Sequence, residues 1–263
     1  MGNILITASH FQTLCQDAIR ILEDNGHHVI LNDHDMPYYS FEELAVWAPD
    51  IQGAIIGMDQ WNEQVFQIAP KLKILARFGV GVDNVDLEAA KRHGVQVVNA
   101  AGLNANAVAE LALALLFSCA RNISIAGHTM RENKWEKKAY SKGFELSGKT
   151  MGVIGYGRIG QLVGAKGQAL GMNVLSVVHR NKPEGCECET MHFVTMDELL
   201  SQSDIVVLCA PSGDKPLVDA ESLAKMKDGV VILNFARDTL VNDDDMAEAL
   251  KEGKVKRYVT DFP

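Results

Sequence analysis

The stretch that decides the fold runs Met151-Gly152-Val153-Ile154-Gly155-Tyr156-Gly157-Arg158-Ile159-Gly160. An apolar run opens it and predicts a buried strand, and the amphipathic residues that follow it predict a helix. In between, Gly155 permits a tight turn, Gly157 lets the backbone approach a pyrophosphate, and Gly160 lets the helix pack closely on the strand. The helix N-terminus adds N–H groups and a positive dipole. The stretch predicts a dinucleotide-binding turn, and the alternative is a glycine-rich turn that binds nothing.

Short β-rich runs alternate with amphipathic stretches on both sides of this turn. Strands are predicted at 3–7, 28–31, 51–56, 72–78, 95–98, 151–155, 173–178, 205–209, 230–234 and 257–260. Helices are predicted at 12–24, 40–47, 61–69, 87–93, 158–170, 196–201, 219–226 and 242–251, with one long helix at 104–137 between the two halves. That helix would begin at Asn104 and place Val108, Leu111, Leu115 and Cys119 on one stripe. The alternation indicates an α/β chain of two doubly wound parallel-sheet domains.

Composition narrows the classes of protein. The chain has 263 residues, of which 47% are hydrophobic, and a formal net charge of −9, which argues against nucleic acid and anionic membranes as partners. The longest apolar stretch, 108–120, is too short to span a bilayer. Five scattered cysteines do not form a disulfide pattern and favour a reducing, cytoplasmic location. Cys186-Glu187-Cys188 is better explained as a loop with two thiols than as part of a metal site, so no metal is expected.

The end of the strand after the glycine turn bears on cofactor choice. It reads Val177-Val178-His179-Arg180, with an apolar residue where sites that prefer NAD carry an acid. A guanidinium two positions later suits a 2′-phosphate, so we expect NADP to be accepted at least as an alternative to NAD. The other interpretation of Arg180 is a solvated loop cation.

Two runs outside the turn resemble one family. Arg77-Phe78-Gly79-Val80-Gly81-Val82-Asp83-Asn84-Val85-Asp86 and Asn99-Ala100-Ala101-Gly102-Leu103-Asn104-Ala105-Asn106-Ala107-Val108-Ala109-Glu110 resemble the D-isomer-specific 2-hydroxyacid dehydrogenases, in particular the phosphoglycerate dehydrogenase branch. Three further motifs agree in order: Leu146-Ser147-Gly148-Lys149-Thr150, Cys209-Ala210-Pro211 and Asn234-Phe235-Ala236-Arg237. The resemblance implies a flavodoxin-like substrate domain at 1–100 and a Rossmann dinucleotide-binding domain at 101–263, the latter including the long helix.

The same resemblance implies an NAD(P)-dependent hydride transfer between a D-2-hydroxy acid and its 2-keto acid. Arg237 would then be the catalytic cation that orients the carboxylate and polarises the ketone, because its planar fork can do both. The backbone amides of Val80 and Gly81 would bind the substrate carboxylate. The implied cofactor contacts are Gly155, Tyr156, Gly157, Arg158, Ile159, Gly160, Val178, His179, Arg180, Ala210, Pro211, Phe235, Ala236 and Asp261.

The sequence also departs from the family pattern. The family's acid/base His and its partner Glu would follow Asp261, but the sequence ends at Pro263. We expect these residues to be a portion of a longer protein that also supplies the segment completing the first domain. The alternative is a product that lacks the His and Glu, and that binds the cofactor without performing chemistry. Residues 57–60 carry no cation, which argues against a phosphorylated substrate. Asp238 follows Arg237 where Gly is commoner, and it would either hold the guanidinium or cap the next turn.

Two further expectations follow from the resemblance. The 104–137 segment is similar to the family's dimerisation helix, so a homodimer is expected, with the substrate bound in a cleft between the domains. The alternative to an enzyme is a dinucleotide-sensing binding protein of the same fold, which performs no chemistry.

Overall fold

The computed structural model describes residues 1–32, 38–177 and 190–262. Its chain divides into two compact units, Met1–Asn104 and Ala105–Pro263, each of which has its own sheet and its own core. Cys186 and Cys188, and the expected cofactor contacts Val178, His179 and Arg180, lie outside the described residues.

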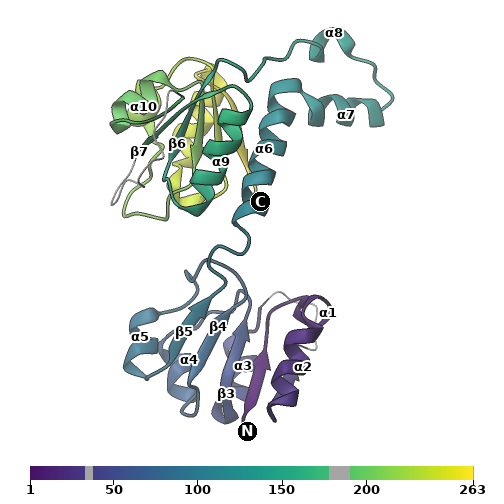
Figure 1. Cartoon of the computed structure of the whole chain (residues 1–263), viewed down its shortest axis with the longest axis vertical. Helices are drawn as coiled ribbons and strands as arrows, with labels where there is room; N and C mark the ends of the chain where they lie inside the picture. The colour runs from purple at the N-terminus through teal and green to yellow at the C-terminus, as the bar shows by residue number, and fades with distance from the viewer. Residues whose placement is uncertain (33–37, 178–189, 263) are drawn as a thin grey trace. The chain divides into compact units, whose positions relative to one another are not determined.

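The first unit is a parallel sheet of five strands between two layers of helices (Figure 1). The strands are β1 (Asn3–Ile6), β2 (His28–Leu31), β3 (Ile51–Ile56), β4 (Ile74–Arg77) and β5 (Gln96–Asn99). Their order is β2-β1-β3-β4-β5, and every pair is parallel. This is the flavodoxin-like order of doubly wound sheets, with a switch point between β1 and β3. The predicted strands are confirmed, with ends that differ by at most two residues.

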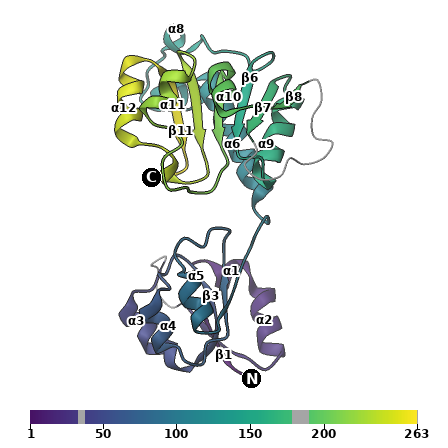
Figure 2. The ribbon, with the colours of Figure 1, turned by 90° about the vertical axis from the view of Figure 1, so that its left-hand side faces the viewer.

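Helices cover the two faces of this sheet unequally. They are α1 (Phe11–Leu14), α2 (Gln16–Asp24), α3 (Phe41–Trp47), α4 (Glu63–Ile68) and α5 (Leu87–Arg92), with a 3-10 turn at Ala48–Asp50. Helices α3–α5 lie on one face and α1 and α2 on the other (Figure 2). The larger core lies under α3–α5 and includes Leu5, Leu75, Trp61 and Phe66, which are essentially inaccessible.

The single helix expected at 12–24 is wrong, since it is two helices. Cys15 has a non-helical backbone (φ −125°) and separates α1 from α2. The short α1 turns Phe11 into the smaller core, where its ring meets the Phe78 ring edge-on at 5.1 Å. Burial of one aromatic side chain therefore overrides the helical periodicity of the sequence.

The second unit is a six-stranded parallel sheet. Its strands are β6 (Thr150–Ile154), β7 (Asn173–Val177), β8 (Met191–Phe193), β9 (Ile205–Leu208), β10 (Val230–Asn234) and β11 (Val255–Thr260). The order β11-β10-β9-β6-β7-β8 is that of the Rossmann dinucleotide-binding fold, with β6 first in sequence and central in space. Strand β8 was not predicted, because three residues are too few to show a period.

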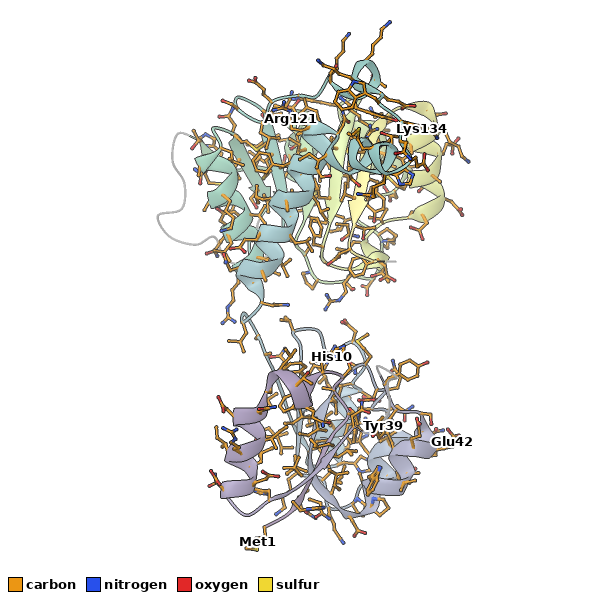
Figure 3. All side chains as sticks on the ribbon, turned by 90° about the vertical axis from the view of Figure 1, so that its right-hand side faces the viewer. Met1, His10, Tyr39, Glu42, Arg121 and Lys134 are labelled. Carbon is orange, nitrogen blue, oxygen red and sulfur yellow. The ribbon has the colours of Figure 1, made fainter. Side chains whose placement is uncertain are left out.

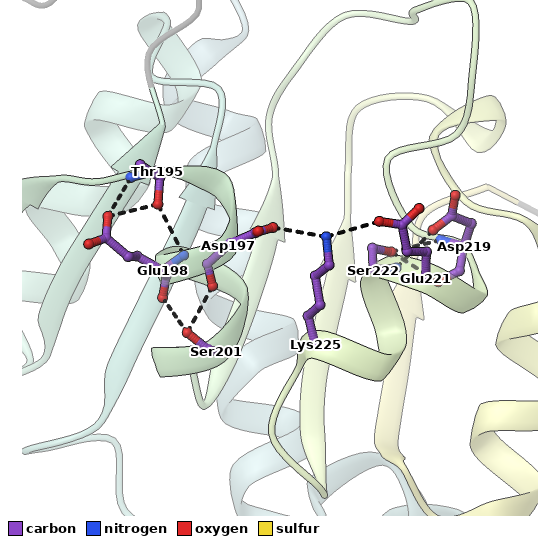
Figure 4. Close-up of polar contacts among 8 residues, drawn as sticks. All are labelled: Thr195, Asp197, Glu198, Ser201, Asp219, Glu221, Ser222 and Lys225. Atoms are coloured by element: carbon purple, nitrogen blue, oxygen red, sulfur yellow. Dashed lines mark hydrogen bonds and ion pairs between the residues drawn. The ribbon is translucent and has the colours of Figure 1, made fainter.

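Helices also cover both faces of the second sheet. One face carries α6 (Ala105–Arg121) and α9 (Arg158–Ala169), and the other carries α10 (Met196–Gln202), α11 (Ala220–Lys225) and α12 (Asp243–Glu252). Capping boxes begin two of these helices, at Thr195 for α10 and Asp219 for α11 (Figure 4). The Lys225 ammonium then joins the two helices by contacting Asp197 and Glu221, each at 3.0 Å.

The long helix expected at 104–137 is also wrong, because two helices occupy the segment and a third begins at its last residue. Helix α6 ends at Arg121, and α7 (Ile123–Arg131) and α8 (Lys137–Tyr140) follow. Asn122 adopts a left-handed conformation (φ 55°), and its side-chain amide donates to the carbonyls of Tyr140 and Lys142. The axes of α6 and α7 differ by 69°. In the described residues no single helix is long and apolar enough to span a membrane, and only the bent α6–α7 pair taken together reaches that length and composition.

The stripe that α6 buries differs from the predicted one. Leu111 is exposed and Cys119 half-buried, whereas the inaccessible residues are mainly alanines. They are Ala105, Ala109, Ala112, Leu113, Leu116 and Ala120. Helix α6 packs on α9, and small side chains at such a contact let two helices approach closely, so periodicity in the larger apolar residues indicated the wrong face.

Glu63 links α4 to α5 and makes the first unit sensitive to acid. Its carboxylate contacts Arg92 at 2.7 Å and His93 at 2.8 Å, and hydrogen bonds from these two groups, His93 first, lower the pKa of Glu63 from 4.5 to about 2. Because the folded-state pKa lies below the unfolded value, the contribution to stability is present above pH 4.5 and is lost as the pH falls from 4.5 towards 2.

We therefore expect Glu63→Gln to lose less thermal stability than the wild type over that pH interval. The measurement is the midpoint of thermal unfolding at a series of pH values, with Glu248→Gln on α12 as an exposed control. Parallel pH profiles for wild type and Glu63→Gln would contradict the role of this cluster.

Candidate functional site

The second sheet brings the predicted cofactor residues to one edge. Strands β6, β9, β10 and β11 are parallel and lie side by side in the order β11-β10-β9-β6, so their carboxyl ends share that edge. The segments that follow these ends contain the predicted residues 155–160, 210–211, 235–237 and 261. Ligands of such sheets bind outside the carboxyl ends, at the point where the strand order reverses, which here is between β6 and β9.

Two glycines of the turn are required by the fold itself. Gly155 has φ +97°, and a Cβ there would lie 2.8 Å from the Ala210 nitrogen and from the Cys209 carbonyl carbon. A Cβ on Gly160 would lie 2.1 Å from the Gly155 carbonyl oxygen. Any side chain at either position would displace backbone, because no flexible atom is there to move.

Packing within the protein does not require a glycine at position 157, the third glycine of the turn. A Cβ on Gly157 would meet nothing within 4 Å, and its φ of −77° suits any residue. Gly157 is the N-cap of α9, a helix of 12 residues, and provides no side chain to cap it. The open space therefore lies at a helix N-terminus, where backbone N–H groups lack intrahelical acceptors. These features fit a pyrophosphate held by the backbone of Arg158 and Ile159.

Packing fixes the walls of this turn. The Tyr156 ring lies on Gly164, where a Cβ would be 3.1 Å from the ring, and meets the Phe193 ring edge-on at 5.3 Å. On the other side, the Cys209 N–H donates to the Ile154 carbonyl at 2.8 Å. Burial raises the pKa of the Cys209 thiol to about 12, so this wall is uncharged.

A buried amide that the sequence analysis missed shapes the segment at the end of β10. Asn234 is fully buried; its side-chain nitrogen donates to the Arg237 carbonyl at 2.8 Å, and its side-chain oxygen accepts from the Ala236 N–H at 3.1 Å. Arg237 itself is half-buried, and its Nη1 donates to the Ala236 carbonyl at 2.6 Å. A lone amide at the end of the apolar run Val230–Asn234 was the signal for this role.

The other two predicted positions at this edge are less enclosed. The Asp238 carboxylate accepts from the Thr239 N–H at 2.8 Å, which favours the turn-capping alternative for that residue. Asp261 is exposed just after β11. In the described ranges no group of three or more His, Cys, Asp or Glu side chains could hold a metal ion.

The first unit presents a second edge with the predicted carboxylate-binding loop. Val80 and Gly81 follow β4, and the Asn99 side chain donates to the Val80 carbonyl at 2.6 Å. The Ala100 N–H donates to the Gly79 carbonyl at 2.9 Å. The end of β5 therefore holds the loop after β4 in a defined shape.

Arg77 is a cation at this edge that the sequence analysis did not include among the site residues. Its guanidinium donates to the Phe78 carbonyl at 2.6 Å and contacts the Met58 sulfur at 3.2 Å, and its buried Nε has no partner in the described part of the chain. Burial lowers the pKa of Arg77, the charges of Asp59 and Asp83 oppose that shift, and an Arg remains charged. The loop at 57–60 thus has a cation beside it, supplied by the next strand.

Strand order, glycine turn and helix N-terminus together define a dinucleotide-binding protein of the doubly wound class. Residues 113–263 match the NAD-binding domain of the D-isomer-specific 2-hydroxyacid dehydrogenases. A hydroxypyruvate reductase from Thermotoga maritima is 38% identical over 217 residues, which are 81% of this chain and 70% of the relative. A D-3-phosphoglycerate dehydrogenase from Archaeoglobus fulgidus is 37% identical over 95% of this chain and 47% of its own length.

Solved structures agree. The TT0316 protein from Thermus thermophilus superposes with a TM-score of 0.87 at 32% identity, covering 99% of this chain and 82% of that one. An NAD-dependent formate dehydrogenase from Staphylococcus aureus in complex with NAD superposes at 0.84 and 29% identity, with 99% and 81% covered. The chain belongs to the D-isomer-specific 2-hydroxyacid dehydrogenase family, and its second unit contains the family's NAD-binding domain. It spans about half the length of the phosphoglycerate dehydrogenases that it matches over nearly its whole length.

The open space at Gly157 generates a test of the cofactor site. We expect Gly157→Ala to fold with unchanged thermal stability, because its Cβ meets no atom within 4 Å, yet to bind NADH at least about tenfold more weakly, because the methyl group occupies the approach to the pyrophosphate. Calorimetric titration with NADH measures the affinity. Gly127→Ala in α7, where the nearest side-chain atom is 3.7 Å away, is the matched control. Equal NADH affinity in both variants would place the pyrophosphate elsewhere.

Proposed function

We propose that this chain is an NAD(P)-dependent oxidoreductase acting on a small D-2-hydroxy acid and the corresponding 2-keto acid. The observation that carries the proposal is the placement of Arg237 on the same sheet edge as the glycine turn, in a segment held by Asn234. When bound, the nicotinamide supplies or accepts the hydride. Acceptance of NADP besides NAD rests on Val178 and Arg180 and remains a proposal.

The protein's own residues would bind and orient the acid. Arg237 has a planar guanidinium that can hold a carboxylate and polarise the adjacent carbonyl. In the first unit, which we propose as the substrate domain, the amides of Val80 and Gly81 are available to an anion once the loop shape is fixed by Asn99. The cofactor contacts proposed for the second unit are the residues of the glycine turn together with Ala210, Pro211, Phe235, Ala236 and Asp261.

Arg77 bears on how much negative charge the substrate can carry. It is half-buried beside the loop at 57–60 and has a buried Nε without a partner in the described residues. The guanidinium as a whole is only half-buried and stays charged, so an anionic group of the substrate can pair with its accessible nitrogens. The objection to a phosphorylated or otherwise dianionic substrate, which rested on the missing cation in residues 57–60, is therefore weakened.

Arg237 is the residue to change. We expect Arg237→Ala and Arg237→Lys to lower turnover of hydroxypyruvate with NADH by roughly a hundredfold or more, since a positioned cation or donor on the reacting carbonyl contributes about that much. The NADH dissociation constant should stay within about twofold, because the guanidinium is assigned to the acid. Arg20→Ala on α2 is an exposed control.

Three results of that assay separate the hypotheses. Full activity of either Arg237 variant would remove this residue from the mechanism. Tight NADH binding by the wild type without turnover of any 2-keto acid would favour the non-catalytic, dinucleotide-sensing alternative. Absence of NADH binding would contradict both.

We also propose a homodimer formed through the α6–α8 segment. Large apolar side chains there are exposed in the single chain, namely Leu111, Phe117, Ile123, Ile125, Met130 and Trp135, the last at 74%. Apolar surface concentrated in one region of a protein is typical of an interface.

The expected mass at micromolar concentration is that of two chains, measured by light scattering or sedimentation. Ile123→Glu should shift the equilibrium towards the monomer, because a carboxylate cannot be buried unpaired at an apolar contact. Lys71→Glu, on the surface of the first unit, is the charge control. A wild-type protein that is monomeric under these conditions would contradict the proposal.

A further inference from the structure

The buried polar side chains of the first unit gather in one place. Among its described residues, the buried polar or charged side chains are Thr7, Asp59 and Asn84, and the other buried side chains are aliphatic or aromatic. Thr7 follows β1, Asp59 lies in the loop after β3, and Asn84 ends the glycine loop after β4. They therefore lie at the carboxyl ends of adjacent strands, where the order of the sheet reverses.

Asp59 is the centre of this group. Its carboxylate is fully buried and accepts from three donors in separate segments, which are the Thr7 hydroxyl, the backbone N–H of Tyr39 (labelled in Figure 3) and the Gly57 N–H at 3.2 Å. The Thr7 hydroxyl oxygen is also 3.3 Å from the Gly57 nitrogen. A buried carboxylate is tolerated only with such partners.

Asn84 connects this centre to the proposed carboxylate-binding loop. Its side-chain amide donates to the backbone carbonyls of Asp59 at 2.6 Å and Gly57 at 3.2 Å. The backbone carbonyl of Asn84 accepts from the Trp61 N–H at 2.8 Å. Asn84 is three residues after Gly81. The loop at 57–61 and the loop that contains Val80 and Gly81 are thus joined by three hydrogen bonds.

The position of the Arg77 guanidinium depends on the loop at 57–61. The guanidinium contacts the Met58 sulfur, and Met58 lies between Gly57 and Asp59, two residues whose backbone the network holds. The Asp59 charge also acts on the guanidinium directly and favours its charged form. An apolar side chain at position 59 could fill space, but it could neither accept the three hydrogen bonds nor supply the charge.

We propose that Asp59 is a positioning residue for the substrate site, which with Thr7 and Asn84 holds Arg77, Val80 and Gly81 in the arrangement that binds the anionic groups of the acid. The inference rests on the proposed function, since it assigns those three residues to substrate. It predicts that damage to the network weakens the acid's binding and spares the dinucleotide's.

The matched variants are Thr7→Val, which keeps the shape and removes the hydroxyl, and Thr7→Ser, which keeps the hydroxyl. Dissociation constants are measured by calorimetry for D-3-phosphoglycerate with saturating NADH and for hydroxypyruvate with saturating NAD, pairs in which no hydride can be transferred. We expect Thr7→Val and Asp59→Asn to bind both acids about tenfold more weakly, with NADH affinity within twofold of wild type. Thr7→Ser should bind them like the wild type.

A control variant separates positioning from general loss of stability. Val95→Ala removes volume from the same core just before β5, at the end of the strand away from this edge, and should lower the melting temperature without changing either acid's affinity. If Val95→Ala weakens the acids as much as Thr7→Val, or if Thr7→Ser fails like Thr7→Val, the positioning role of Asp59 is overturned. If the wild type binds NADH but neither acid, the proposed function fails and the inference fails with it.

Discussion

A steric constraint at one glycine organises the second unit. The carboxyl end of β9 lies so close to Gly155 that a single added carbon would lie 2.8 Å from backbone atoms, and the Gly155 carbonyl in turn excludes a side chain at Gly160. Helix α9 must therefore begin directly above β6, with its N-terminus at the point where the strand order reverses. The open space at Gly157 follows from this arrangement. No protein atom lies within 4 Å of the position that a Cβ of Gly157 would take, so the fold itself does not require a glycine there.

Both units bring their candidate site residues to the carboxyl edge of a parallel sheet, and in both units buried polar side chains hold the loops at that edge. Asn234 orders the segment that contains Arg237, and Asp59 with Asn84 orders the loops beside Arg77. A buried amide or carboxylate must find several partners, so it fixes loop geometry more specifically than an apolar residue of similar size. We infer that the cations are positioned mainly by these buried groups.

Much of the fold could be predicted from the sequence because strand and helix periods were strong. The strands of the first unit and the glycine turn were located to within two residues. The parallel direction of the strands was predicted from the alternation of strands with helices. The errors have local causes. Asn122 breaks the long helix through a left-handed backbone, Cys15 divides another so that Phe11 can be buried, and α6 buries alanines that a search for large apolar residues overlooks.

The candidate site was less accessible to sequence reasoning. Residues 155–160 and 237 could be selected because a motif and a resemblance named them. Arg77 and Asn234 were quoted within motifs but not selected, although a lone amide that ends an apolar strand was a signal for Asn234. The importance of Asp59 showed only through burial and partners, since Asp is common in loops. The cation that was sought within the loop at 57–60 is supplied by Arg77, at the end of the next strand. This became visible only from the pairing of β3 with β4.

The most direct test of the central claim is a crystal structure of the chain grown with NADH. The account predicts electron density for the pyrophosphate against the backbone of Gly157, Arg158 and Ile159, with the nicotinamide towards Arg237. Density for the dinucleotide at any other edge of the sheet, or a pyrophosphate that avoids the N-terminus of α9, would contradict it.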